Sequence, residues 1–265
     1  MRMNEEFSVQ SITDRVLTPA LAEVEIAVTG PADEVRGRLM GPSCRFSSTV
    51  EVAYPLRPVE ALPAAILQAT IPEPCFWEPQ SPFLYHGPVE FWRDGKLRSK
   101  LPISHGLRSL ALGPPGLRLN SQPHFLRAVC RERPTEAELL ELRQAGCNAL
   151  VAPADPDLWD AADRLGFLMI GRPSPAMERV ALRQHPSALG WLLKQDDAVL
   201  PGWRDFGYLG LELDRPLAGP PPSWASFIVC PLEMTPSSPM LGLPRLVRSR
   251  SEVSALPGLI GWIRF

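Results

Sequence analysis

The chain has 265 residues, enough for one large domain or two ordinary ones with a real core. Its 27 basic and 29 acidic residues give a net charge of −2 without a long run of either sign, which excludes the charge pattern of a nucleic-acid or anionic-membrane binder. The five cysteines are scattered and form no CxxC pair, which indicates reduced thiols and no metal site. No apolar run is long enough to span a membrane. Because the first residues form no apolar leader and the chain has no nucleotide-binding motif, we expect a cytoplasmic protein without a cofactor.

The first 112 residues have the pattern of an all-β domain. Apolar and polar residues alternate over 24–28, 50–54 and 67–71, with no helical period between them. The pair Asp94-Gly95 predicts a hairpin turn, since its second residue readily takes a positive φ. Short strands at this spacing predict an immunoglobulin-like β-sandwich over residues 1–112.

A Gly-Pro-Pro-Gly segment at 113–116 is the predicted domain boundary, and strands then alternate with helices. A capping box at Thr135–Glu138, an Asp155-Pro156 pair and a Ser174-Pro175 pair each predict the start of a helix. The first two of these helices are expected to end at Gly146 and Gly166. Such βα units in close succession indicate a parallel sheet or barrel.

Eight apolar segments in this part of the chain are strand candidates. They lie at 125–130, 148–153, 167–170, 189–193, 209–213, 227–229, 245–247 and 259–265. Eight strands in roughly 150 residues match the strand count of a (β/α)8 barrel, which typically takes about 250 residues. The predicted fold class is therefore multi-domain, β plus α/β, with a shortened (β/α)8-type barrel over residues 117–265 after the sandwich.

An ordered series of short motifs runs from about residue 70 to 196. The motifs are Pro74–Tyr85, His105–Arg108, Leu119–Arg127, Ala145–Ala149, Asp163–Phe167 and His185–Ser187, followed by Trp191. In this order the series resembles glycoside hydrolase family 2, the group of β-galactosidases, β-glucuronidases and β-mannosidases. The resemblance implies a sandwich followed by a TIM barrel, and a retaining mechanism that needs two carboxylates about 5 Å apart.

The same resemblance implies that the catalytic site is degenerate. Where the family has Asn-Glu, with the Glu as acid/base, this chain has Gln195-Asp196, and the shorter Asp withdraws its carboxylate by about 1.5 Å. A displacement near 1 Å costs on the order of 100-fold in rate. The family's nucleophile position aligns with Arg250. Framework residues persist while polar site residues are replaced, so we expect a catalytically degenerate relative.

Three functions stay open at this point. The preferred one is a non-catalytic pseudoenzyme that serves as a carbohydrate-binding or assembly subunit. The second is a weak or altered retaining β-glycosidase, in which Asp196 is the acid and Glu233 or Glu252 is the second carboxylate. The third is a protein-docking scaffold, because a barrel without its peripheral helices would expose apolar surface and demand a protein partner or self-association.

Several candidate residues have two interpretations. Asp196 is either a surviving acid or part of a solvated loop or helix cap, and Glu233 is either a substitute carboxylate or part of a rim ion pair. Glu212 and Asp214 alternate on one strand, where exposed or paired side chains are favoured over a catalytic dyad.

Substrate contacts are the least specific part of the sequence pattern. The candidate substrate-binding residues are Gln195, Trp191, Arg131 and Trp262. The two tryptophans are either a sugar-stacking floor or core residues. The four histidines lack metal-ligand spacing, so we expect each to be structural.

Overall fold

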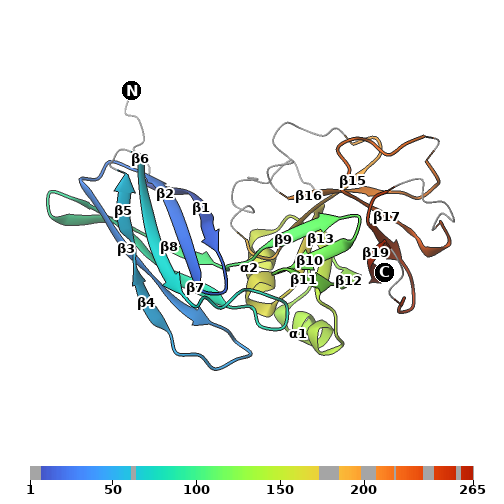
Figure 1. Ribbon diagram of the computed structural model, residues 1–265, viewed down its shortest axis with the longest axis horizontal. Coiled ribbons are helices and arrows are strands. Elements are labelled where there is room, and N and C mark those ends of the chain that lie inside the picture. Colours follow the sequence, from blue (N-terminus) through green and yellow to red (C-terminus); the bar gives the residue numbers. More distant parts are fainter. Residues whose placement is uncertain are drawn as a thin grey trace. The chain divides into compact units, whose positions relative to one another are not determined.

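The computed structural model describes residues 7–60, 64–172, 185–197, 207–217, 219–234, 242–254 and 258–264. The chain forms two compact units, which divide between Arg108 and Ser109 (Figure 1). The helix predicted at Ser174-Pro175 lies outside the described residues. In the described parts, no helix is both long and apolar enough to cross a membrane.

The first unit is a sandwich of two four-stranded antiparallel sheets. One sheet has the order β1 (Ser8–Leu17), β2 (Leu21–Thr29), β6 (Ala64–Pro72), β5 (Arg57–Glu60), and the other has the order β4 (Val52–Pro55), β3 (Glu34–Ser43), β7 (Leu84–Arg93), β8 (Lys96–His105). Both sheets contribute to one core, with Ile26 and Leu67 from the first sheet and Leu39 and Phe91 from the second.

Two local predictions for this unit are confirmed. The alternating residues of 24–28 and 67–71 are buried at every second position, as period 2 requires. Asp94 and Gly95, with φ of 52° and 70°, form the turn between β7 and β8. The alternation at 50–54 does not reach the core, because Val50 precedes β4 and is 84% exposed.

The second unit is built on a closed barrel of eight parallel strands. The strands are β12 (Leu126–Cys130), β13 (Ala149–Pro153), β14 (Leu168–Arg172), β15 (Ala188–Lys194), β16 (Tyr208–Glu212), β17 (Phe227–Pro231), β18 (Arg245–Arg248) and β19 (Leu259–Arg264). Each corresponds to one of the eight segments that the apolar pattern predicted. Because all eight run in the same direction, every carboxyl end lies on one rim of the barrel, which we call the barrel mouth.

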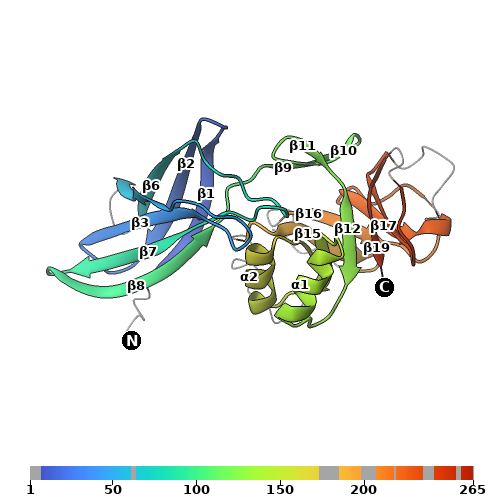
Figure 2. The ribbon, with the colours of Figure 1, turned by 90° about the horizontal axis from the view of Figure 1, so that it is seen from below.

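Two helices cover the outside of the first half of the barrel. Helix α1 (Glu136–Gln144) starts at Thr135 with the predicted capping box, and α2 (Pro156–Leu165) starts at Asp155 and ends at Gly166 in the left-handed conformation. Leu139 of α1 and Trp159 of α2 pack with outward-facing strand residues in one apolar cluster. Figure 2 shows the two helices side by side along the barrel wall.

The second half of the barrel has a different cover. Its outward-facing apolar residues, such as Leu211, Ile228 and Trp262, are buried under side chains from connecting segments, including Trp224 and Leu243. Among the described residues after β15, the one helical element is the 3-10 turn Leu232–Met234. Over the residues that the structure describes, the barrel therefore has few helices, in agreement with the shortened barrel predicted.

A three-stranded sheet precedes the barrel within the second unit. It has the order β11 (Gln122–His124), β10 (Gly116–Leu119), β9 (Leu110–Gly113), so the Gly113–Gly116 segment forms a hairpin turn. The Tyr208 hydroxyl accepts from the Leu112 amide at 3.0 Å and donates to the Leu110 carbonyl at 3.2 Å. These bonds attach the small sheet to the amino end of β16, opposite the barrel mouth.

Candidate functional site

The predicted site residues follow the carboxyl ends of barrel strands, so they lie at the barrel mouth. Gln195 and Asp196 follow β15, and Arg131, Glu233, Arg250 and Glu252 follow β12, β17 and β18. All six side chains are exposed. Within the described part of the chain, no hydrogen bond or ion pair joins any two of them. The fold gathers these residues at one rim without assembling them into a dyad.

Asp196 lies in a turn that its neighbour closes. The Lys194 amide donates to the Asp197 carboxylate at 2.7 Å, and the Asp197 amide donates to the Lys194 carbonyl at 3.1 Å. Asp196 itself is exposed in this turn. The geometry matches the solvated-loop interpretation of the Asp196-Asp197 pair.

Trp191 and Trp262 lie in the apolar core. Trp191 stacks on Trp159 with ring centroids 5.7 Å apart and is 6% exposed, and Trp262 is 3% exposed. A sugar-stacking platform needs an exposed ring face, which neither residue offers. The structure thus places both tryptophans in the role of core residues, the alternative that the sequence left open.

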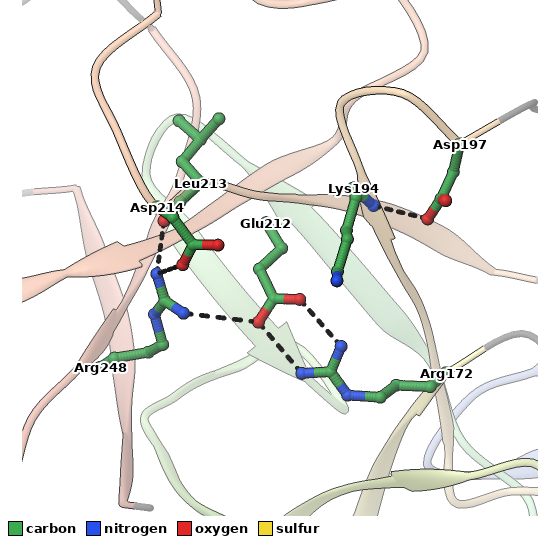
Figure 3. A network of polar contacts seen from close by, with 7 residues as sticks. All are labelled: Arg172, Lys194, Asp197, Glu212, Leu213, Asp214 and Arg248. Carbon is green, nitrogen blue, oxygen red and sulfur yellow. Dashed lines mark hydrogen bonds and ion pairs between the residues drawn. The ribbon is translucent and has the colours of Figure 1, made fainter.

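A network of charged residues at the barrel mouth centres on Glu212, the last residue of β16 (Figure 3). The side chain of Glu212 is 6% exposed. Arg172, the last residue of β14, donates to its two carboxylate oxygens at 2.8 and 3.0 Å. Arg248, the last residue of β18, places a guanidinium nitrogen 3.7 Å from one of these oxygens. Three strand ends thus meet at one buried carboxylate.

Arg248 extends the network to the exposed rim. It donates to the Leu213 carbonyl and to the Asp214 carboxylate. The hydrogen bond from Arg248, followed by its charge, lowers the pKa of Asp214. The hydrogen bonds to Glu212 raise the pKa of Arg172 further above its usual range. Of the two alternatives favoured for Glu212 and Asp214, exposed or paired side chains, both residues are paired, although Asp214 follows β16 and does not lie on it.

These contacts decide what Glu212 can do chemically. Among the described residues it is the one buried carboxylate at the barrel mouth. A general acid must present a carboxyl oxygen to the substrate, but the carboxylate of Glu212 is buried and faces two guanidiniums. A nucleophile needs an accessible oxygen, but both oxygens of Glu212 accept from Arg172. The network is an ion-paired cluster in which guanidinium donors engage the carboxylate oxygens of Glu212.

The opposite, amino end of the barrel holds a second polar network. Asp163 of α2 accepts from the Ser187 amide at 2.9 Å and from His185 Nδ1 at 2.6 Å. Burial lowers the pKa of His185, but the hydrogen bond and charge of Asp163 outweigh it, so the pKa is raised. Both side chains are 10% exposed. This pair ties α2 to the entry of β15, which fits the structural role expected of His185.

The same region contains the one group of potential metal ligands found among the described residues. Ligand atoms of Asp160, Asp163 and His185 lie within 4.8 Å of one another. However, the 2.6 Å between His185 Nδ1 and Asp163 Oδ2 is the length of a direct hydrogen bond. A metal ion about 2.0–2.2 Å from each atom would force the pair apart, so we assign the group as an ion pair.

Asn148 holds a separate group of polar contacts at the same end of the barrel, which includes His124. The Asn148 side chain accepts from the Arg127 amide at 2.7 Å and donates to the Phe125 carbonyl at 2.9 Å. It also lies 3.3 Å from His124 Nε2. Burial, with a smaller contribution from the Arg127 charge, lowers the pKa of His124 to about 4. Asn148 thus joins the segment before β12 to the segment before β13.

Sequence reasoning did not single out Arg172, Lys194 or Arg248 as site residues. Each is the charged residue that ends an apolar barrel strand. That position is the available signal, because the carboxyl ends of parallel barrel strands share one rim. Which of these residues form ion pairs depends on which strand ends face each other across the barrel, and the sequence pattern does not predict that.

Comparisons with known proteins give a consistent picture. The sequence matches no protein-family model. The β-galactosidase BoGH2A from Bacteroides ovatus is 26% identical over 119 residues, which cover 39% of this chain and 14% of that protein. A glycosyl hydrolase family 2 member from Bacteroides cellulosilyticus has a TM-score of 0.66 at 15% identity, covering 96% of this chain and 43% of that one. A β-D-glucuronidase from Dictyoglomus thermophilum has a TM-score of 0.66 at 11% identity, covering 98% of this chain and 61% of that one.

This chain therefore spans 14% of the curated relative's length and between 43% and 61% of the length of these two solved structures. The structural likeness extends over nearly all of its own residues, through the sandwich and the barrel. The sandwich followed by a closed parallel barrel is thus the fold of solved glycosyl hydrolase family 2 proteins.

Proposed function

We propose that this chain is a non-catalytic relative of family 2 glycoside hydrolases that serves as a carbohydrate-binding or assembly subunit. The observation that carries the proposal is the ion pairing of Glu212. The one carboxylate that the described residues bury at the barrel mouth is held by Arg172 and faces a second guanidinium, from Arg248. A site arranged in this way favours charge pairing over proton transfer.

The remaining carboxylates at the mouth support the proposal. Asp196, Glu233 and Glu252, the candidates for a weak or altered glycosidase, are all exposed. A glycosidase acid is usually kept protonated near neutral pH by burial or by a neighbouring negative charge. Arg250, at the position aligned with the nucleophile, is also exposed and brings a positive charge. Neither half of the catalytic pair has the expected environment.

The docking-scaffold alternative draws less support from the barrel surface. It relies on apolar barrel residues that lose their cover when helices are missing. In the described part of the chain, the large hydrophobic side chains that are exposed all belong to the first unit: Phe46, Val50, Val52, Val59 and Leu97. The connecting segments therefore bury the apolar barrel residues that the helices would otherwise cover.

Hydrolysis assays on the full chain test the proposal. We expect no release of aglycone from aryl β-galactosides, β-glucuronides or β-mannosides above the buffer rate, and no difference between the natural chain and Asp196→Asn. Asp160→Asn is the matched control, because it makes the same chemical change at an exposed Asp on α2. Hydrolysis that is lost in Asp196→Asn and kept in Asp160→Asn would overturn the proposal.

Two further measurements separate the non-catalytic roles. Titration calorimetry with methyl β-glycosides tests carbohydrate binding, and light scattering of the purified chain tests assembly. Binding without turnover supports the first role, and a stable oligomer supports the second. A monomer that neither binds nor hydrolyses any of these glycosides contradicts both.

A further inference from the structure

Three cationic side chains gather around Glu212 at the barrel mouth. Arg172, Lys194 and Arg248 end three different strands, β14, β15 and β18, and their side chains converge on this carboxylate (Figure 3). Two carboxylates of the cluster, the buried Glu212 and the exposed Asp214, form ion pairs with its arginines. A third, Asp197, accepts a hydrogen bond from the Lys194 backbone amide. The two arginines are therefore held in ion pairs, and within the described residues the third cation, Lys194, is not.

Lys194 is the cation of this cluster whose ammonium group forms no ion pair with a described carboxylate. Among the described residues it takes part in no ion pair, although its charge helps to lower the pKa of Asp214. The nearby Asp197 carboxylate accepts from the Lys194 backbone amide instead. Figure 3 shows the ammonium end of Lys194 turned toward Glu212 and Arg172. Its side chain is exposed, so a ligand can reach it from solvent.

We propose that the barrel mouth binds a tetrahedral oxyanion, a phosphate or sulfate group, with Lys194 as its principal charge. The guanidinium fork of Arg172, which best fits a planar carboxylate, is already occupied by Glu212. The group that can still bind an anion is the Lys194 ammonium, a compact charge with three hydrogen-bond donors that rotate freely. The positive charges of the two arginines add to the electrostatic potential there. This combination suits an anion with oxygens in several directions better than a second planar carboxylate.

The inference deepens the proposed function and rests on it, because it names the class of carbohydrate that the mouth would hold: a sugar carrying a phosphate or sulfate group. A free inorganic anion has the same recognition chemistry. The test therefore needs probes with the anion alone, the sugar alone and both together.

Titration calorimetry at low ionic strength with inorganic phosphate, glucose and glucose 6-phosphate provides that test. The variant is Lys194→Gln, an exposed substitution that keeps the backbone bond to Asp197. The control is Lys100→Gln, which removes the same charge from one of the three lysines of the chain. Lys100 lies on β8 of the first unit, 3.1 Å from Glu90.

We expect glucose 6-phosphate to bind more tightly than glucose and inorganic phosphate. Affinity should fall about tenfold in Lys194→Gln, the size expected for one charge-assisted hydrogen bond, and stay unchanged in Lys100→Gln. Equal affinities in the two variants, or glucose binding as tightly as glucose 6-phosphate, would overturn the inference. Inorganic phosphate binding as tightly as glucose 6-phosphate, with the same Lys194 dependence, would support the anion site and contradict the carbohydrate role. Hydrolysis in the assays above would contradict the proposed function alone.

Discussion

The two ends of the barrel use polar residues in opposite ways. At the amino end, Asp163, His185 and Asn148 make direct bonds between neighbouring segments. At the mouth, charged residues from distant strands surround one carboxylate, and other charges face solvent. In barrels of this class, residues at the amino end stabilise the fold, and residues at the carboxyl end act on ligands.

This difference explains what the sequence motifs mean. The motifs that resemble family 2 glycosidases include Asn148, Asp163 and His185, and these residues lie at the structural end of the barrel. The positions that depart from the family, such as Asp196 and Arg250, lie at the mouth. The motifs therefore identify a fold, and the function has to be argued from the mouth.

The largest effect is expected from breaking the amino-end network at Asp163. Asp163→Ala removes the hydrogen-bond acceptor of the buried His185 and of the Ser187 amide, and leaves His185 only the exposed Asp160 carboxylate at 3.7 Å. We expect the free energy of unfolding to fall by about 3–5 kcal/mol, measured by urea denaturation of the full chain. Asp160→Ala removes an exposed carboxylate from the same helix and should change it by less than about 0.5 kcal/mol. Equal losses of unfolding free energy in Asp163→Ala and Asp160→Ala would contradict the stabilising role assigned to Asp163.

Breaking the mouth network at Glu212 should affect stability less and binding more. Glu212→Gln leaves Arg172 and Arg248 without their shared carboxylate, but these side chains are 35% and 18% exposed and keep part of their hydration. We expect a loss of about 2–3 kcal/mol in the free energy of unfolding. Affinity for glucose 6-phosphate should rise, because a competing anion is gone. A fall in affinity in a folded Glu212→Gln variant would contradict the anion site.

The amino end should also be acid-sensitive, through His124. Its pKa is about 4 in the folded chain and about 6.5 when unfolded, so the unfolded chain binds more protons between these values. Stability is therefore lost as pH falls from about 6.5 to 4. We expect a loss of about 2 kcal/mol, allowing for partial exposure of the ring. Urea denaturation across this window should show the loss reduced in His124→Gln, and an unchanged slope would contradict it.

His185 acts in a separate pH window. Its pKa is raised in the folded chain, so its contribution is fully present below the unfolded value near 6.5 and is lost as pH rises through the folded value. The same denaturation series extended above pH 6.5 should show a decline in stability that disappears in His185→Gln. If the decline in stability persisted in His185→Gln, a titrating group other than His185 would be its cause.

The smallest effect is expected at Asp196. Its side chain is exposed in the turn after β15. Asp196→Asn should change the free energy of unfolding by less than about 0.5 kcal/mol and leave the affinity for glucose 6-phosphate within about twofold. A larger change in either measurement would place Asp196 in the network around Glu212. The separation between stabilising residues at the amino end and ligand-binding residues at the mouth would then be less clear.

Most of the fold could be predicted from the sequence because its signals are local. The capping box at Thr135, the Asp155 cap and the eight apolar strands depend on residues close to one another in the chain. The mouth network could not be predicted in the same way. Arg172 and Glu212 are 40 positions apart, and only closure of the barrel brings them together. Trp191 was ambiguous because apolar aromatic residues serve equally in a core and in a sugar site.

We infer that the barrel mouth lacks a working nucleophile. A retaining glycosidase forms a covalent glycosyl intermediate on a carboxylate, and 2-deoxy-2-fluoro glycosyl fluorides slow its breakdown enough for intact-mass spectrometry. The chain incubated with the galactosyl, glucuronyl and mannosyl reagents should keep its unmodified mass. A one-to-one adduct that maps to Glu212, Glu233 or Glu252 would contradict the account.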